Sequence, residues 1–304
     1  MRQYVLARLL QLVVVMVGIS IITFGLTYVL GDPLAVLLPL DAPKEQRELY
    51  RHQLGLDQPL PVQYLHFAAG AVHGDFGDSF LIKKPAMALV LERFPATAQL
   101  ALAGLAVAML IALPLGTLAA YHRRSVIDSL CTMLAVAGQA IPIYWLGLML
   151  IIVFAVQLHL LPASGYGRPD NFVLPSIALG AFLAPITMRL VRSSMIEVLT
   201  QDYIRTARTK GLSETGVLLR HAAKNAALPV VSVLGLQFGQ LLGGAVVTET
   251  TFSWPGVASF TVDSISNADY PVVQAAVVLL AALISLVNLG VDLAIGTLDP
   301  RIRP

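Results

Sequence analysis

Long stretches without Asp, Glu, Lys or Arg dominate the pattern of this sequence. Each stretch holds at least 18 residues, is rich in Leu, Val, Ile and Ala, and lacks any regular alternation of polar and apolar positions. Because a helix rises about 1.5 Å per residue, roughly 20 residues cross the ~30 Å hydrocarbon core of a bilayer. A lipid-spanning β-barrel would need the missing alternation. The pattern predicts an all-α membrane protein with six transmembrane helices, at 9–31, 94–121, 129–158, 171–188, 225–248 and 270–291.

The first apolar stretch has basic residues in front of it, as a secretory signal peptide would. Arg2 and Arg8 precede it. However, its apolar run is longer than the roughly 7–15 residues of a signal-peptide core, and no small-x-small cleavage site follows. We therefore expect an uncleaved first helix.

The distribution of Lys and Arg predicts the orientation of the helices. If the N-terminus is cytoplasmic, 13 of the 20 basic residues fall on cytoplasmic segments, seven of them at 189–224. Six of the other seven lie in a first loop too long to count fully in this rule. We therefore expect both termini to be cytoplasmic. The expected parts are the N-terminus and first helix at 1–31, a long extracytoplasmic loop at 32–93, and a core at 94–304 with helices two to six and a cytoplasmic insert at 189–224.

The long first loop carries signals for ordered structure. Acidic and basic residues at mixed spacing predict a helix at 43–54, which Gly55 would end. A Pro-rich turn is expected at 58–61. The apolar spacing that follows, at 62–72, favours a short helix lying in the membrane interface.

The outer loop after the fifth predicted span reads ETTFSWPGVASFTVDSISNADYP and holds no Lys or Arg. Glu249, Trp254, Pro255 and Gly256 are candidates for an extracytoplasmic gate or docking site. An equally good interpretation of Trp254 is a simple anchor at the membrane interface, because Trp is enriched there.

Composition agrees with a membrane protein and narrows the chemistry. Charged residues make up 12 % of the chain and the mean hydropathy is +0.76; a soluble domain carries about 25 % charged residues. The single cysteine, Cys131, excludes a disulfide framework and a Cys-based metal site within one chain.

Motifs for catalysis are missing from the sequence. It holds no GxxxxGK[ST], HExxH, GxSxG or GxGxxG pattern, and its six histidines lack the spacing of metal ligands. We expect neither an enzyme nor a metal site, so energy for uphill transport would enter from elsewhere. An ion-coupled carrier acting alone stays as an alternative, weakened by the lack of carboxylates inside the spans. A signalling or assembly protein is a third.

Polar residues inside the spans suggest a path for a polar solute. Gln139 and Gln240 are the candidates to line it, although hydrogen bonding between helices explains them equally well. In the fifth predicted span, Gly235, Gly239 and Gly243 recur every four residues. We expect this strip to let another helix approach closely.

The cytoplasmic insert contains QDYIRTARTKGLSETGVLLRHAAKNAALPVV at 201–231. Good helix formers predict a helix at 201–210, and Gly211 suits the left-handed conformation that ends a helix. Ser213 can cap a second helix with Glu214 in its first turn. A basic loop could simply set topology or meet anionic lipid. Two capped helices are better suited to transmitting movement from a soluble partner.

The insert resembles the EAA loop of ABC-importer permeases, and is most similar to the peptide/nickel branch. The family pattern is Glu-Ala-Ala, three residues and Gly, with Leu-Pro downstream. Here Arg205, Thr206, Ala207 and then Gly211 match it, followed by Leu228–Pro229. Arg replaces Glu and the last gap is longer, as is usual in that branch. Six further motifs resemble it in order: GDP at 31–33, LGLDQPLPVQY at 54–64, GDFGDSF at 74–80, FSWPGV at 252–257, DYPVVQ at 269–274 and LDPRIR at 298–303.

This resemblance implies a type I ABC-importer permease of the bacterial inner membrane that imports dipeptides or oligopeptides. Nickel, a metal chelate or glutathione is the alternative cargo. The implied partners are a homologous second permease in a heterodimer, two cytoplasmic ATPases that use ATP and Mg²⁺, and an extracytoplasmic substrate-binding protein. The chain itself is expected to bind no cofactor and no nucleic acid. The resemblance assigns contact with the ATPase to the coupling residues Tyr203, Arg205, Thr206, Ala207, Arg208, Lys210 and Gly211.

Overall fold

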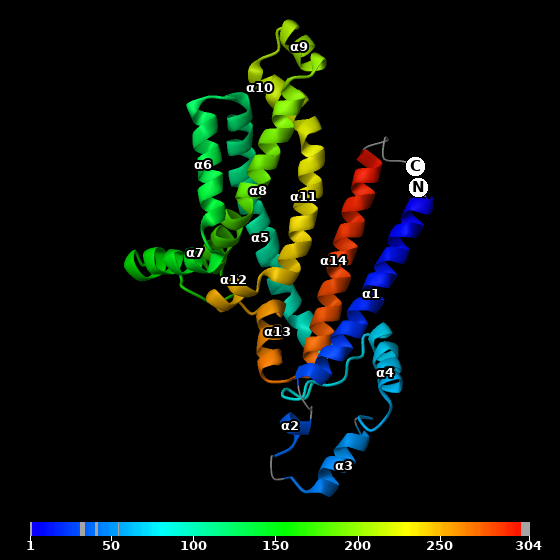
Figure 1. Ribbon diagram of the computed structural model, residues 1–304. Coiled ribbons are helices and arrows are strands. Elements are labelled where there is room, and N and C mark those ends of the chain that lie inside the picture. The colour runs from blue at the N-terminus through cyan, green and yellow to red at the C-terminus, as the bar shows by residue number, and fades with distance from the viewer. Residues whose placement is uncertain (1, 31–33, 40–41, 54, 299–304) are drawn as a thin grey trace. The chain divides into compact units, whose positions relative to one another are not determined.

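The computed structural model describes residues 2–30, 34–39, 42–53 and 55–298 (Figure 1). The regular structure of these residues is helical, with one isolated bridge between Asp78 and Pro85. The GDP motif at 31–33, Leu54 and residues 299–303 of the LDPRIR motif lie outside the described residues. The elements are α1 Arg2–Leu30, α2 Leu34–Leu37, α3 Lys44–Gln53, α4 Leu60–Val72, α5 Ala86–Tyr121, α6 Val126–Ala140, α7 Ile143–Leu150, η1 Ile151–Gln157, η2 Pro169–Phe172, α8 Val173–Leu199, α9 Asp202–Thr209, α10 Glu214–Gly216, η3 Val217–Ala222, α11 Ala223–Gly244, α12 Val246–Thr251, α13 Val257–Ser266 and α14 Tyr270–Leu298.

Among the described residues, four helices are long and apolar enough to cross a membrane, and the chain is a multi-pass membrane protein. They lie in α1, α5, η2–α8 and α14. Two bent helix pairs raise the number to six if each pair is one span. One pair joins α6 to α7 and η1 at 95°, and the other bends by 55° between Ala227 and Pro229. The prediction of six spans therefore agrees with the structure only when both bent pairs are counted.

The third predicted span is not one continuous helix, which corrects the sequence-based expectation for 129–158. Helix α6 ends at Ala140, and Ile141 adopts an extended conformation with φ −80° and ψ 121°. Pro142 follows and lies just before α7. Proline lacks the N–H that a helix needs and disfavours the helical conformation of the residue before it. The sharp bend therefore has a local cause.

The chain folds into two compact units. Unit 1 holds the described residues of 98–254 and 287–304, and unit 2 holds those of 2–97 and 255–286. Helices α5 and α14 contribute to both units.

Unit 1 is built around α8, the most buried of the candidate spans. Glycines bring α5 against it. A Cβ added at Gly180 would lie 2.5 Å from Cγ1 of Val107, and one at Gly116 would lie 2.7 Å from the carbonyl oxygen of Met188. Contacts this short mean that the two backbones almost touch, as small residues allow between membrane helices.

The glycine strip of α11 produces one such approach. A Cβ at Gly235 would lie 2.0 Å from Cγ2 of Val291 in the part of α14 that belongs to unit 1. The predicted close approach of another helix is confirmed at Gly235. For Gly239 and Gly243 it stays a prediction.

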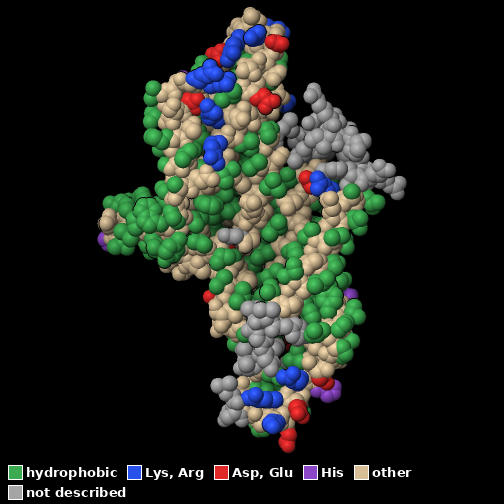
Figure 2. Space-filling model, in the orientation of Figure 1, with side chains coloured by type: hydrophobic (Ala, Val, Ile, Leu, Met, Phe, Trp, Pro, Cys, Tyr) green, Lys and Arg blue, Asp and Glu red, His purple; other side chains and the backbone are tan. Residues whose placement is uncertain are grey.

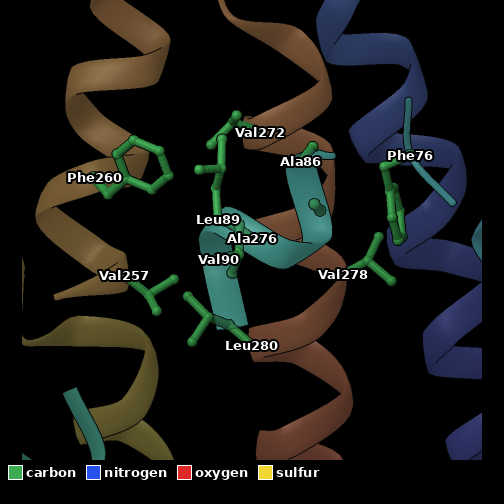
Figure 3. Close-up of a cluster of buried hydrophobic side chains, with 11 residues drawn as sticks. Phe76, Ala86, Leu89, Val90, Val257, Phe260, Val272, Ala276, Val278 and Leu280 are labelled. Carbon is green, nitrogen blue, oxygen red and sulfur yellow. The ribbon is translucent and has the colours of Figure 1, made fainter. Parts of the chain in front are cut away.

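Unit 2 contains the long loop, and both helices predicted there are present. The Pro-rich turn expected at 58–61 is shorter than predicted, because Leu60 and Pro61 already belong to α4. The helices expected at 43–54 and 62–72 are α3 and α4, and Gly55 between them has φ +67°. An apolar core joins α5, α13 and α14, where Phe260 of α13 lies near Leu89 of α5, and Val257 of α13 lies near Leu280 of α14 (Figure 3). The buried members of this core are Phe76, Ala86, Leu89, Val90, Val257, Phe260, Val272, Ala275, Ala276, Val278 and Leu280.

Hydrogen bonds join distant segments of unit 2. The buried carboxylate of Asp269 accepts hydrogen bonds from the Ser79 hydroxyl and, at 2.9 Å, from the Phe80 backbone N–H. The Val257 N–H donates to the Thr97 hydroxyl oxygen at 2.8 Å. These hydrogen bonds therefore join the GDFGDSF motif to the DYPVVQ motif. The sequence alone shows only that both motifs resemble those of a family.

Candidate coupling site

The insert extends from the end of α8 as a folded helical corner (Figure 1). Helix α9 is amphipathic, and its Ile204 and Ala207 are buried in an apolar cluster. That cluster also contains Met195 of α8 and Val217 and Ala222 of η3. Residues three apart on a helix share a face, so one face of α9 packs against η3 and into the cluster that η3 shares with α8.

The corner itself follows the predicted capping pattern. Gly211 has φ +79°, a left-handed conformation that glycine adopts without strain. The Ser213 hydroxyl accepts a hydrogen bond from the Gly216 N–H at 3.3 Å. Across the corner, the Arg208 guanidinium donates to both carboxylate oxygens of Glu214, at 2.9 and 3.2 Å. This ion pair escaped the sequence analysis, although both residues were singled out separately.

Six of the seven predicted coupling residues are exposed, and Ala207 is buried. The Arg205 side chain is 79 % exposed, which leaves its guanidinium accessible to a partner. Tyr203 also has an internal role, because its hydroxyl accepts a hydrogen bond from the Asn225 side chain at 2.7 Å. Figure 2 shows Lys and Arg side chains gathered over the end that α9 and α10 form. The exposed face of α9 is therefore polar and basic.

The two candidates for a solute path lie on different helices. Gln139 is near the end of α6 and Gln240 is in α11, and both side chains are exposed on this chain. By contrast, Gln237 is buried and accepts a hydrogen bond from the Thr187 hydroxyl at 3.0 Å. Gln237 therefore bonds between helices, whereas path lining stays a prediction for Gln139 and Gln240.

The candidate gate or docking residues are mostly inside the protein. Glu249 and Trp254 are 0 % and 1 % exposed. The indole packs edge-on against Tyr166 and Phe172, with ring centroids 4.9 and 4.6 Å away. An interfacial anchor must reach the lipid headgroups, so that interpretation of Trp254 is wrong. Pro255 is half-buried and Gly256 is buried next to the start of α13.

The sequence analysis missed a buried ion pair at the start of α6. Arg192 of α8 donates from Nε and Nη2 to the two carboxylate oxygens of Asp128, at 2.6 and 2.8 Å. The only signal was an acid just before one predicted span and two bases, Arg189 and Arg192, just after another. Sixty-four positions separate Asp128 from Arg192, so no local pattern connects the two.

Two family models cover nearly the whole chain. "Binding-protein-dependent transport system inner membrane component" matches residues 112–304, and the N-terminal model of such membrane components matches residues 1–101. The chain therefore belongs to the family of inner membrane components of binding-protein-dependent transport systems. The resemblance inferred from the motifs is confirmed, and so is the prediction of a transporter subunit in place of an enzyme.

Individual relatives are similar over their full length. The dipeptide transport system permease protein DppB of Escherichia coli K12 is 40 % identical, over 100 % of this chain and 99 % of that protein. The glutathione transport system permease protein GsiC of the same strain is 41 % identical, with the same coverage. A solved amino acid ABC transporter aligns with 70 % of this chain and 94 % of its own, at TM-score 0.49 and 14 % identity. That last similarity is too weak to support a conclusion.

Proposed function

We propose that this chain is one membrane half of an ATP-driven ABC importer that carries peptides across the bacterial inner membrane. Two relatives that are similar over their full length, the dipeptide permease DppB and the glutathione permease GsiC, support a small peptide as cargo. Both termini are cytoplasmic in this proposal, and each bent helix pair counts as one of six spans.

The machine needs partners that supply energy and cargo. A homologous permease forms the second half of the pathway, and two cytoplasmic ATPases hydrolyse ATP with Mg²⁺. A substrate-binding protein delivers the peptide to the loop at 32–93. A gate or docking role stays a prediction for the segment at 249–256, whose Glu249 and Trp254 are buried. Gln139 and Gln240, exposed on this chain, face the pathway between the halves.

The way α9 is attached carries the mechanical part of the proposal. Its apolar face packs through Ile204 and Ala207 into the cluster that η3 and α8 share, while Arg205 on the outside is exposed. An ATPase that holds this exposed face moves α9, and the buried face passes the movement to α8. The corner at Gly211 sets the angle at which the chain returns to the membrane. Closing of the ATPase pair thereby switches the spans between inward-open and outward-open states.

Reconstitution tests this proposal. The chain is purified with its permease partner, ATPases and binding protein, and is placed in liposomes with labelled dipeptide, glutathione or Ni²⁺. We expect dipeptide uptake that requires both ATP and the binding protein. Uptake of only glutathione or Ni²⁺ would replace the proposed cargo. Uptake by the chain alone, without ATP, would overturn the proposal in favour of an independent carrier.

A further inference from the structure

Helices α6 and α8 meet along a seam of small side chains, and a pocket opens beside this seam. Cys131 and Ala135 of α6 pack with Met188 of α8 and with two alanines of α5. A cavity of about 180 Å³ lies along the same seam. Its lining residues are Ile111, Leu115, Cys131, Leu134, Ala135, Gly138, Ala181, Ala184, Pro185 and Met188. This pocket opens at the surface of the chain, and α6 stays in contact with α8 beside it, where a Cβ added at Gly138 would lie 3.4 Å from Cγ of Pro185.

One polar link between the two helices adds to this packing at the start of α6. The two-pronged bond between Arg192 and Asp128 fixes both distance and rotation, because the guanidinium and the carboxylate are planar. The Asp128 side chain is 8 % exposed and that of Arg192 is 30 % exposed. The carboxylate also accepts the Arg124 N–H at 3.0 Å, and the Ser125 hydroxyl accepts the Asp128 N–H at 3.3 Å. The turn before α6 is thereby tied to the same point.

The pair lies where movement from the insert would arrive. Arg192 is seven residues, about two helical turns, before Leu199 at the end of α8. Its neighbours Val191 and Met195 belong to the cluster that buries Ile204 of α9. The part of α8 that holds α9 therefore also holds Asp128.

A sharp bend separates the far end of α6 from α7. Gln139 lies in its last turn, and the 95° bend follows immediately. From Asp128 to Gln139 is 11 residues, about 16 Å along a helix. A small rotation of α6 about its first turn therefore displaces Gln139 over a long arm.

We infer that Asp128 and Arg192 form the pin through which movement of α9 and α8 is transmitted to α6. The inference rests on the proposed function. The pin holds the first turn of α6 to α8, while the open pocket beside the seam leaves room for the rest of α6 to tilt and carry Gln139 with it. Asp128 and Arg192 are positioning residues for transport, and they act without touching peptide or ATP.

The experiment compares ATP hydrolysed per peptide imported in the reconstituted importer. Asp128→Asn and Arg192→Gln remove the charge pair, and we expect the ratio to rise by about 2- to 30-fold while hydrolysis continues. Exchanging the charges in Asp128→Arg/Arg192→Asp should bring the ratio back toward wild type. Arg192→Lys keeps the charge but loses the two-pronged geometry, so an intermediate ratio is expected.

The controls separate a pin from a merely structural contact. Arg168→Gln removes an ion pair with Asp170, also in unit 1, whose Arg side chain is 77 % exposed, and should leave the ratio unchanged. If Asp128→Asn and Arg192→Gln lower hydrolysis and uptake in parallel, the pair only stabilises the fold and the inference is wrong. If Asp128→Asn fails to assemble, the amount of ATP hydrolysed per peptide imported by Arg192→Lys decides between a pin and a purely structural contact. An unchanged ratio in that variant also overturns the pin.

Filling the seam tests the tilting step with the pair intact. Ala135→Leu places a larger side chain in the cavity and should lower uptake while binding of the ATPases persists. Normal uptake by this variant would show that α6 does not tilt. If wild-type importer takes up no peptide with ATP, the proposed function fails. If wild type transports and every pair variant keeps its ratio, only the pin fails.

Discussion

Asp128 in unit 1 and Asp269 in unit 2 are buried carboxylates that are held by different chemistry. Asp128 in unit 1 is 5 % exposed and meets the charged Arg192 of another long helix. Asp269 in unit 2 is 2 % exposed and accepts from the neutral Ser79 hydroxyl and the Phe80 N–H. Both join segments far apart in the sequence.

The difference follows from the packing around each carboxylate. Asp269 precedes α14, whose positive helix end favours a carboxylate, and its donors lie in a short loop closed by the Asp78–Pro85 bridge. The apolar core of Figure 3 holds these segments together as well. Neutral donors are sufficient where packing already holds the segments. Asp128 lies at the start of a seam of small side chains, where the directional charge pair adds to the packing of α6 on α8. We therefore expect loss of the Asp269 hydrogen bonds to lower stability, and loss of the Asp128–Arg192 pair to impair coupling.

Replacing the corner glycine of the insert should give the largest effect. Gly211→Val forces a β-branched residue to φ +79°, which L-residues adopt only with strain. We expect uptake to fall by more than about tenfold while ATP hydrolysis persists, a change of the size typical of coupling between sites. Initial rates of uptake and hydrolysis measure it.

Unit 2 offers a matched control for this substitution. Gly77 has φ +80°, and at both glycines an added Cβ meets nothing within 4 Å. Gly77→Val therefore introduces similar backbone strain, and we expect it to keep the wild-type ratio of ATP to peptide. Normal transport by Gly211→Val at normal expression would refute the coupling role of the corner.

Unit 1 also contains a tight contact between two helices, and a substitution at Gly235 tests it. Gly235→Ala places a methyl group 2.0 Å from Cγ2 of Val291, so we expect a loss of about 1–3 kcal/mol from overpacking. Thermal unfolding of the purified subunit in detergent measures the loss. Val291→Ala in the same chain should recover most of it. Absence of such rescue would show that α11 and α14 do not meet here.

Breaking the neutral link in unit 2 should cost somewhat less. Asp269→Asn sets an amide against donors that need an acceptor, and we expect a loss of about 1–2 kcal/mol. The same unfolding assay applies, and ATP hydrolysed per peptide should not change. A raised ratio without a stability loss would contradict the assignment of Asp269 to structure alone.

The smallest stability effect is expected at the exposed ion pair of the corner. Arg208 and Glu214 are 38 % and 44 % exposed, and exposed pairs contribute about 0–1 kcal/mol. Arg208→Gln should therefore hardly shift the unfolding temperature. A strong loss of ATPase binding in this variant, measured by copurification, would assign Arg208 to partner contact. Unchanged binding would show that Arg208 serves only the ion pair with Glu214 and the charge bias that sets topology.

Sequence reasoning succeeded where structure follows from neighbouring residues. The helix before Gly211, its left-handed end and the Ser213 cap are local conformational preferences, and all three are present. The two helices of the long loop were found for the same reason. Pro142 is also a local signal for a break in the helix. The prediction overlooked it because the apolar residues on both sides form one run long enough for a single span.

The sequence by itself determined that this chain is a membrane protein of an importer family with a capped helical insert. Hydrophobic length, charge bias and turn residues are properties of short segments, and they persist in any arrangement of those segments. Only the tertiary structure decided that Arg192 meets Asp128, that Asp269 meets Ser79, and that Trp254 is buried. Such contacts join positions tens to hundreds of residues apart, and they depend on which helix faces pack together. That choice is made by side-chain shape and directional bonds in three dimensions, which no local pattern records.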